Sequence, residues 1–561
     1  MLRLTWVQPE DLIGHELHQA TQDGREPSAV KARWKAAGGK EAPLRAGASP
    51  EPASRYLRQL AEDLLDELAD LPSRLADSEP TSLAKIKASC PAWPTQPAGT
   101  RATGPTQPAG SGPAGPTQPA GTRATGPTQP AGSGPAGPTQ PAGTRATGPA
   151  QPAGSGPAGP TQPAGTRATG PAQPAGSRAA GAAPDPKKGG GTPQALASDP
   201  TPAATPTQAR LEAAWLGRAV GCLLGKPVEK LPLQAIRALA QSTGNWPLNT
   251  YFTARGVPTQ LLTQHPWNRR SASTSLAENI DGMPEDDDLN YPLLNLLLLQ
   301  RHGKTFTTTD VATLWLDELP AGRTFTAERI AYRNLLTGLE PPRTARHRNP
   351  FREWIGALIR ADVHGWTNPG DPAAAAEQAH RDATLTHTAN GVYAAMFTAA
   401  TIAQAATGTA DIHTALRTGL TVIPPASRLA KALTHAIQLA RTHDDFDTVV
   451  DELHATHAPT HHWVHAIPNT ALIAAALTHA DGDFTGSICR AVSGGWDTDS
   501  NGATAGSIAA LLAGSPAALP DHWTTPLKNR LATTIGDFNG TGFDTLAHLT
   551  HTLTHLEAPR P

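Results

Sequence analysis

Residues 215–229 read Trp-Leu-Gly-Arg-Ala-Val-Gly-Cys-Leu-Leu-Gly-Lys-Pro-Val-Glu. Glycine recurs at every fourth position, at Gly217, Gly221 and Gly225, so on a helix these residues share one face. We call this face the glycine ridge, because it carries no side chains and lets another backbone pack closely against it. Pro227 then ends the helix, since it lacks the amide hydrogen that a further turn needs.

The region that contains this helix, residues 206–556, is rich in Ala, Leu and Thr and repeats the helical period. Strand-like alternation is scarce there. The sequence therefore predicts one large all-α domain, which is long enough to bury a core. The clearest helices are expected at 290–301, 373–384, 391–407, 427–442, 469–479 and 503–513.

Two further segments precede this domain. Residues 94–181 repeat an eleven-residue unit eight times, with frequent Pro and Gly and almost nothing to bury. We therefore predict a disordered linker over 89–205, partly polyproline II; a tail for Pro-recognising partners is the alternative. Residues 1–88 are predicted to be a partly helical extension with an amphipathic helix over 54–71. That helix needs a docking surface, either on the large domain or on a partner.

The composition excludes several classes of protein. The formal net charge is −2, and no basic stripe is present, so we expect no nucleic-acid partner. The first residues lack the layout of a secretory signal, and no apolar run reaches the roughly 20 residues that span a bilayer. We therefore expect a cytoplasmic protein without a membrane partner. Three widely spaced cysteines indicate neither a disulfide framework nor a cysteine-based zinc site.

Two acid-rich strings lie more than two hundred positions apart, Glu-Asp-Asp-Asp at 285–288 and Gly-Gly-Trp-Asp-Thr-Asp-Ser at 494–500. Carboxylates repel one another when they are brought together, so a buried cluster requires a cation or a proton. All-oxygen sets suit hard cations such as Mg²⁺ or Mn²⁺. Taken alone, the first string is equally typical of a solvated helix start, and Glu229 of a surface acid.

These elements, in this order, resemble the ADP-ribosylglycohydrolase family. The resemblance rests on the glycine-spaced helix that ends in Gly-Lys-Pro-Val-Glu at 225–229, the acid triplet at 286–288 and the late loop at 494–500, and it covers roughly 208–555. Two further stretches are similar to family segments, Gly-Ala-Leu-Ile-Arg at 356–360 and Leu-Thr-His at 385–387. The resemblance implies an all-α orthogonal helical bundle.

The sequence differs from the family's usual motifs at two points. Members of the family usually have Thr-Asp-Asp-Thr at the acid triplet. We align Asp286 with the first Thr of that motif and Leu289 with the second. A register one residue earlier would place Glu285 first and Asp288 at the final Thr. Trp496 is an insertion in the late loop, which otherwise keeps its order.

The resemblance implies a hydrolase that cleaves the glycosidic bond between ADP-ribose and a modified protein side chain or small molecule. It implies two Mg²⁺ ions, with Mn²⁺ as an alternative, and Glu229 as the residue that positions or deprotonates water. The implied metal ligands are Asp286, Asp287, Asp288, Asp497, Asp499 and Ser500. The alternative function is a catalytically inactive ADP-ribose-binding module.

The implied substrate contacts are Arg360 with the diphosphate, His387, and the backbone at Gly494 and Gly495. Each has a structural alternative: Arg360 as an ion-pair partner, and His387 as a satisfied core histidine. Three histidines at 548, 551 and 555 have metal-like spacing, but the Thr and Leu around them favour a surface helix. No motif defines which acceptor carries the ADP-ribose or the oligomeric state.

Overall fold

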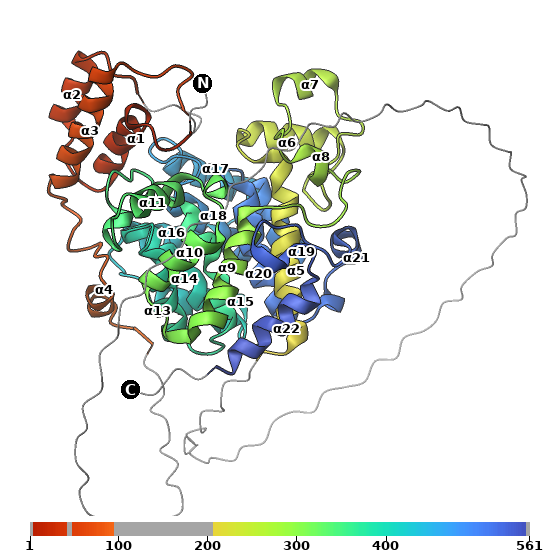
Figure 1. The fold of residues 1–561 in the computed structure, drawn as a ribbon. Helices are drawn as coiled ribbons and strands as arrows, with labels where there is room; N and C mark the ends of the chain where they lie inside the picture. Colours follow the sequence, from red (N-terminus) through yellow and green to blue (C-terminus); the bar gives the residue numbers. More distant parts are fainter. Residues whose placement is uncertain (1–3, 42–47, 95–205, 557–561) are drawn as a thin grey trace, which may run out of the picture. The chain divides into compact units, whose positions relative to one another are not determined.

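The computed structural model describes residues 4–41, 48–94 and 206–556, and all of these fall in one compact unit. Within them every regular element is a helix, and the only β-type pairing consists of two isolated bridges. The predicted all-α class is therefore confirmed (Figure 1). The repeats, apart from Pro94, lie outside the described residues.

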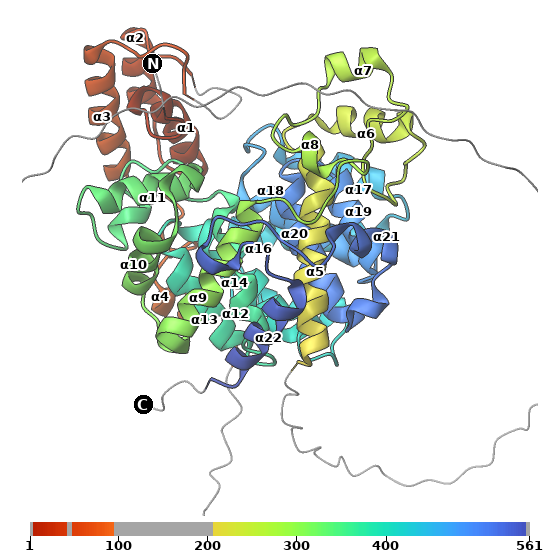
Figure 2. The ribbon, with the colours of Figure 1, turned by 45° about the vertical axis from the view of Figure 1, so that its right-hand side comes forward.

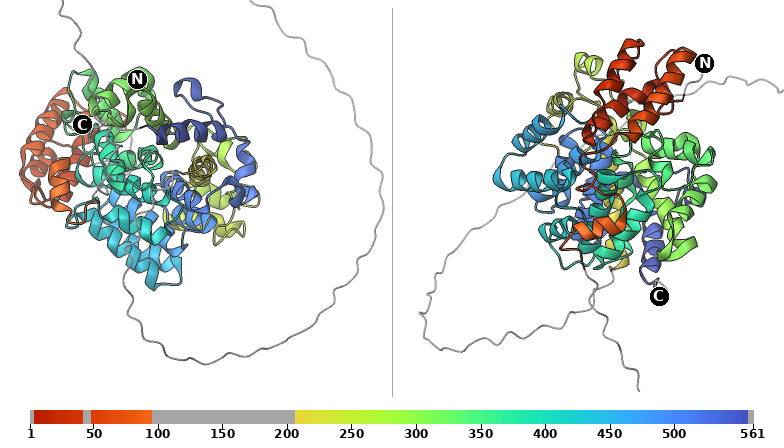
Figure 3. Two further views of the ribbon diagram at one scale, coloured as in Figure 1. Left: turned by 90° about the horizontal axis from the view of Figure 1, so that it is seen from below. Right: turned by 90° about the vertical axis from the view of Figure 1, so that its left-hand side faces the viewer.

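The N-terminal extension contains four helices, of which the first three pack side by side (Figure 3). They are α1 (Pro9–Gln22), α2 (Ser28–Ala36), α3 (Arg55–Asp70) and α4 (Leu83–Ser89). The predicted amphipathic helix is α3, which begins where the Ser54 hydroxyl accepts the Leu57 amide. Its buried face, Leu64, Leu65 and Leu68 among others, packs into the same core as the large domain.

The large domain begins with α5 and continues to the last described residues. Its first helices are α5 (Gln208–Gly225), α6 (Leu233–Ser242), α7 (Thr259–Gln264), α8 (Ala272–Ser275), α9 (Asp287–His302), α10 (Thr308–Glu318), α11 (Thr326–Leu336), α12 (Asp362–Trp366) and α13 (Pro372–Ala383). The rest are α14 (Ala389–Ala405), α15 (Ile412–Leu420), α16 (Arg428–Thr442), α17 (Phe446–His457), α18 (Ala466–His479), α19 (Phe484–Ser493), α20 (Thr498–Ala513), α21 (Asp521–Thr524) and α22 (Phe543–Thr554). Short 3₁₀ turns stand at 226–228, 303–305, 321–323, 343–345, 355–360, 516–518, 525–527 and 536–538.

The glycine ridge of α5 packs directly against α20 (Figures 1 and 2). A Cβ atom on any ridge glycine would overlap a carbonyl oxygen of α20, at Gly506, Gly502 and Thr498 in turn. The Thr498 hydroxyl also donates to the Gly225 carbonyl at 2.8 Å. Because the two backbones touch, the last residue of α5 and the first turn of α20 are held together, and each carries one part of the acid-rich motif.

Helix α9 begins earlier than the sequence predicted. It starts at Asp287 with Asp286 as N-cap, so Pro292 lies in its second turn and not in its first. Pro292 has no amide hydrogen for the Asp288 carbonyl four residues before it. The guanidinium of Arg218 on α5 donates to that carbonyl instead, at 2.7 Å. The proline is therefore tolerated because a side chain from α5 supplies the missing hydrogen bond.

None of the helices in the described ranges is both long and apolar enough to cross a bilayer.

Candidate metal centre

One cavity of about 470 Å³ receives carboxylates from three segments that are distant in the sequence. They come from the exit of α5, the start of α9 and the start of α20. The acidic side chains that line it are Glu229, Glu285, Asp286, Asp287, Asp497 and Asp499, together with Glu328 on α11, and Ser500 is one of the hydroxyl residues beside them. Residues of all three motifs therefore line one cavity.

The loop before α20 is shaped by two residues with positive φ, Gly495 (81°) and Trp496 (59°). It is then fixed by Asn469 on α18, whose side-chain oxygen accepts the Asp497 amide at 3.1 Å and the Asn501 side chain at 2.8 Å. The turn brings Asp497 and Asp499 close to Glu229: oxygens of the three carboxylates all lie within 4.8 Å of one another.

Glu229 is half-buried, and both of its carboxylate oxygens have partners. Asn268 donates to Oε2 at 2.7 Å, and the Lys230 ammonium lies 2.6 Å from Oε1. A carboxylate held at both oxygens cannot rotate freely. Its orientation toward the cavity is therefore set before any ligand binds.

The acid triplet at the start of α9 divides between two environments. The Asp286 carboxylate accepts the Asp288 amide at 2.9 Å and forms a buried ion pair with Lys226, and Asp287 also lines the cavity. Asp288 does not line it. Its side chain is buried and pairs with Arg218 at 3.1 Å.

Burial and mutual repulsion disfavour the charged forms of these acids. Burial, followed by the charges of Asp286 and Asp288, raises the pKa of Asp287 far above its ordinary value. Burial and the neighbouring Asp499 do the same to the pKa of Asp497. The pKa of Asp499 rises to about 7, because of burial and then the charges of Glu229 and Asp286. The cavity thus holds more negative charge than its own cations neutralise.

A hard divalent cation fits this excess of charge and the all-oxygen donors. The best-supported position is between Glu229, Asp497 and Asp499, with the Ser500 hydroxyl also lining the cavity. The second acidic group, Cys222 with Asp286 and Asp288, fits less well. Lys226 and Arg218 already pair with its carboxylates, and burial raises the pKa of the Cys222 thiol well above its ordinary value.

Two predicted substrate contacts lie elsewhere. Arg360 is fully buried and does not line the cavity; its guanidinium pairs with Asp382 and Glu328, each at 3.0 Å. His387 is also fully buried, and burial lowers its pKa well below the ordinary value. For Arg360 the ion-pair alternative holds, because the carboxylates that neutralise it come from α11 and α13. His387 is a core histidine whose Nδ1 is 2.6 Å from the Thr386 hydroxyl, while its buried Nε2 has no hydrogen-bond partner among the described residues.

The two glycines predicted to offer backbone contacts lie outside the cavity lining. Neither Gly494 nor Gly495 lines the cavity. A Cβ on Gly494 would overlap Leu472, and its carbonyl faces the His454 ring nitrogen at 2.8 Å. Gly495 supplies the positive φ that the turn needs. Both residues therefore shape the loop that presents Asp497.

Sequence reasoning missed the residues that orient the acids. Lys226 was inside the quoted motif, but nothing indicated that its ammonium would meet Asp286. Asn268 and Asn469 are single polar residues outside any motif, and only their contacts with Glu229 and with the Asp497 amide identify them.

Residues 203–558 match the profile of the family described as ADP-ribosylglycohydrolase. The chain belongs to this family. A solved structure described as an ADP-ribosylglycohydrolase-related protein complex is similar, with 22% identity and a TM-score of 0.40 over 63% of this chain and 99% of that chain. No curated protein matches the chain. Members of the ADP-ribosylglycohydrolase family hydrolyse linkages of ADP-ribose, and the acid cavity lies within the matched residues.

Proposed function

We propose that the chain is a metal-dependent hydrolase that cleaves the glycosidic bond between ADP-ribose and a protein side chain or small molecule. The observation that carries the proposal is the meeting of Glu229, Asp497 and Asp499 in one cavity of the family domain. These residues come from segments about 270 positions apart in the sequence, and their excess charge calls for a cation.

We assign one Mg²⁺ position, or Mn²⁺ in its place, to Glu229, Asp497, Asp499 and Ser500. A second ion would use Asp286 and Asp287, and Asp286 would then have to release the Lys226 ammonium. Bound divalent ions would orient the ribose diol and stabilise charge as the glycosidic bond opens. Asp288 would support these metal ligands indirectly, through its ion pair with Arg218.

Glu229 acts on the attacking water. The carboxylate takes a proton from water, the water oxygen bonds to the anomeric carbon, and the bond to the acceptor breaks with its electrons going to the acceptor. Asn268 and Lys230 keep Glu229 fixed during this step. The transition state has oxocarbenium character, as in other glycoside hydrolysis.

The test combines binding with turnover. Calorimetry follows Mg²⁺ and ADP-ribose binding, and a release assay on ADP-ribosylated protein is run beside it with and without EDTA. Asp497→Ala is expected to abolish Mg²⁺-dependent release with an unchanged helical circular-dichroism spectrum, and Asp521→Asn on the surface serves as the control. Binding without any release would indicate an ADP-ribose-binding module, and full release by Asp497→Ala would remove the metal assignment.

A further inference from the structure

The acid cavity has one wall that does not come from the family domain. Trp6 lines it together with Phe325 and Ile355, although the family match begins only at residue 203. The Trp6 side chain is 9% exposed and packs edge-on against Phe351, with ring centroids 5.3 Å apart. It also packs edge-on against Trp354 at 5.9 Å. A residue of the N-terminal extension is therefore built into the site.

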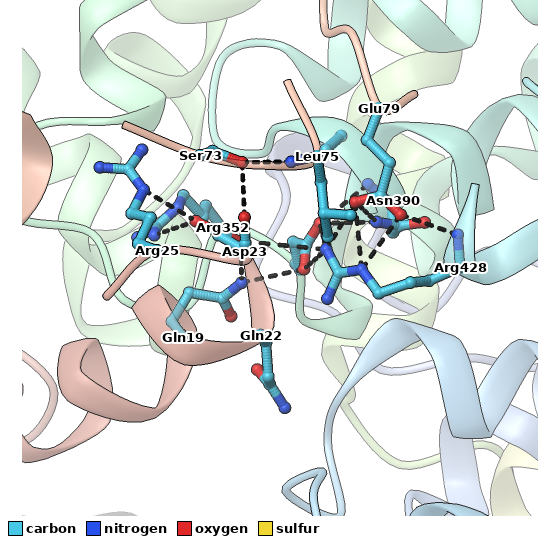
Figure 4. Close-up of polar contacts among 12 residues, drawn as sticks. Gln19, Gln22, Asp23, Arg25, Ser73, Leu75, Glu79, Arg352, Asn390 and Arg428 are labelled. Atoms are coloured by element: carbon cyan, nitrogen blue, oxygen red, sulfur yellow. Dashed lines mark hydrogen bonds and ion pairs between the residues drawn. The ribbon is translucent and has the colours of Figure 1, made fainter. Parts of the chain in front are cut away.

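The extension is attached to the domain by buried ion pairs (Figure 4). The Arg352 guanidinium of the domain donates to both carboxylate oxygens of Glu16, at 2.7 and 2.9 Å, and also pairs with Asp23 at 2.6 Å. The side chains of Arg352 and Glu16 are 8% and 5% exposed. Removing one partner would leave an uncompensated buried charge, so these contacts hold the extension in one position.

A second group of contacts lies farther along the extension. Glu79 pairs with the Arg428 guanidinium at 2.7 Å and accepts the Asn390 side chain at 2.9 Å (Figure 4). The Gln19 amide donates to Glu353 of the domain at 2.9 Å. The extension is thus fixed at both α1 and the segment after α3.

The peptide next to Trp6 is anchored separately. Arg329 on α11 donates to the Thr5 hydroxyl at 2.8 Å and to the Thr5 carbonyl at 3.3 Å. The same guanidinium lies 5.6 Å from the centre of the Phe325 ring. One arginine therefore contacts both the residue before Trp6 and the Phe325 ring.

The cavity is lined by two chemically different kinds of side chain. Besides the acids of the proposed cation site, its lining includes the apolar residues Trp6, Phe325, Ile355, Ile359, Trp463 and Val464. Lys230 lies over the Trp463 ring at 5.5 Å, and Arg329 lies over Phe325. Among the described residues no cation is placed over the Trp6 ring, in contrast to the Trp463 and Phe325 rings of the same lining.

We infer that Trp6 contacts the planar base of the substrate nucleotide, so that the extension completes the substrate site. The inference rests on the proposed function, because it assigns the acidic residues of the cavity to the ribose diol and leaves the apolar lining residues for the base. Every nucleotide base has a planar face that can stack on an aromatic side chain, whichever base it is. Trp6 is thus a specificity-determining residue that lies outside the family domain.

The test compares two ligands at saturating Mg²⁺ in the full chain. ADP-ribose carries the base, and ribose 5-phosphate does not. Loss of one aromatic stack corresponds to about five- to 150-fold in affinity. Trp6→Ala should therefore weaken ADP-ribose binding by about tenfold, change ribose 5-phosphate binding by less than about twofold, and be largely rescued by Trp6→Phe.

Trp93→Ala is the matched control, because it also removes an indole that precedes the family domain, at a site that does not line the cavity. It should leave both affinities unchanged. Equal losses of both ligands in Trp6→Ala, or an unchanged ADP-ribose affinity, would overturn the inference while the proposed function stands. Wild-type protein that binds no ADP-ribose would overturn both.

Discussion

Asp499→Asn should stabilise the metal-free protein. The pKa of Asp499 is raised from 3.8 to about 7 by burial and by its acidic neighbours. Each pKa unit corresponds to about 1.4 kcal/mol, so the ionised carboxylate destabilises the metal-free fold by up to about 4 kcal/mol above pH 7. Asparagine removes the charge and keeps the side-chain oxygen that accepts the Ser500 amide at 3.1 Å. Because part of the burial cost remains for a neutral amide, we expect a gain of about 1–3 kcal/mol.

The pH dependence of this gain has a definite sign. Between pH 3.8 and about 7 the folded state binds more protons at Asp499 than the unfolded state does, so stability from this group falls as the pH rises. The difference between the variant and the wild type should therefore be small near pH 4 and largest above pH 7. Urea unfolding in EDTA at several pH values measures it.

Mg²⁺ should offset the stability gained by Asp499→Asn. A ligand at 100 times its dissociation constant stabilises the fold by about 2.7 kcal/mol, and Asp499→Asn should lose most of this effect. Asp521→Asn, a change of the same chemistry on the exposed start of α21, should match the wild type under both conditions. The reasoning would be refuted if Asp499→Asn were less stable than the wild type in EDTA, or if Mg²⁺ stabilised Asp499→Asn as much as it stabilises the wild type.

Three further changes test other parts of the account. Gly221→Ala places a methyl group against the Gly502 carbonyl and should reduce the free energy of unfolding by about 1–3 kcal/mol or more, whereas Gly322→Ala, with open space around it, should have little effect. Burial and the charge of His18 lower the pKa of His15 to about 4. The stability that the neutral His15 contributes is therefore present above pH 6.5 and is lost as the pH falls toward 4. His15→Phe should make unfolding less sensitive to pH over that range, as thermal melts would show. Deletion of residues 94–181 should leave turnover of a small ADP-ribosyl substrate nearly unchanged, because the repeat offers no ligand set; a large loss of turnover would contradict this.

The predictable parts of the site are those that depend only on residues close together in the sequence. The glycine ridge indicated a close backbone contact, and the spacing of Asp497 and Asp499 placed two acids in one turn. Both features depend on a few neighbouring residues and on helix geometry. The helix over 54–71 was likewise found as α3 from its leucine spacing.

The remaining features depend on partners that are distant in the sequence. Arg360 looked like a phosphate ligand until Asp382 and Glu328 were seen to neutralise it. Asp288 looked like a metal ligand, but Arg218 draws it away from the cavity. Trp6 is a single aromatic residue without any periodic signal, and only the fold brings it to the site.

The most direct test of the central claim is Glu229→Gln, measured for turnover and for ADP-ribose affinity at Mg²⁺ concentrations that saturate the variant. Glutamine keeps the shape and an oxygen for the Asn268 contact, but it cannot take a proton from water. General bases contribute about 10² to 10⁴ in rate, so release of ADP-ribose should fall at least about a hundredfold while its dissociation constant changes little. Turnover equal to that of the wild type, or a wild-type protein that binds ADP-ribose with Mg²⁺ and releases none from any modified substrate, would contradict the hydrolase mechanism.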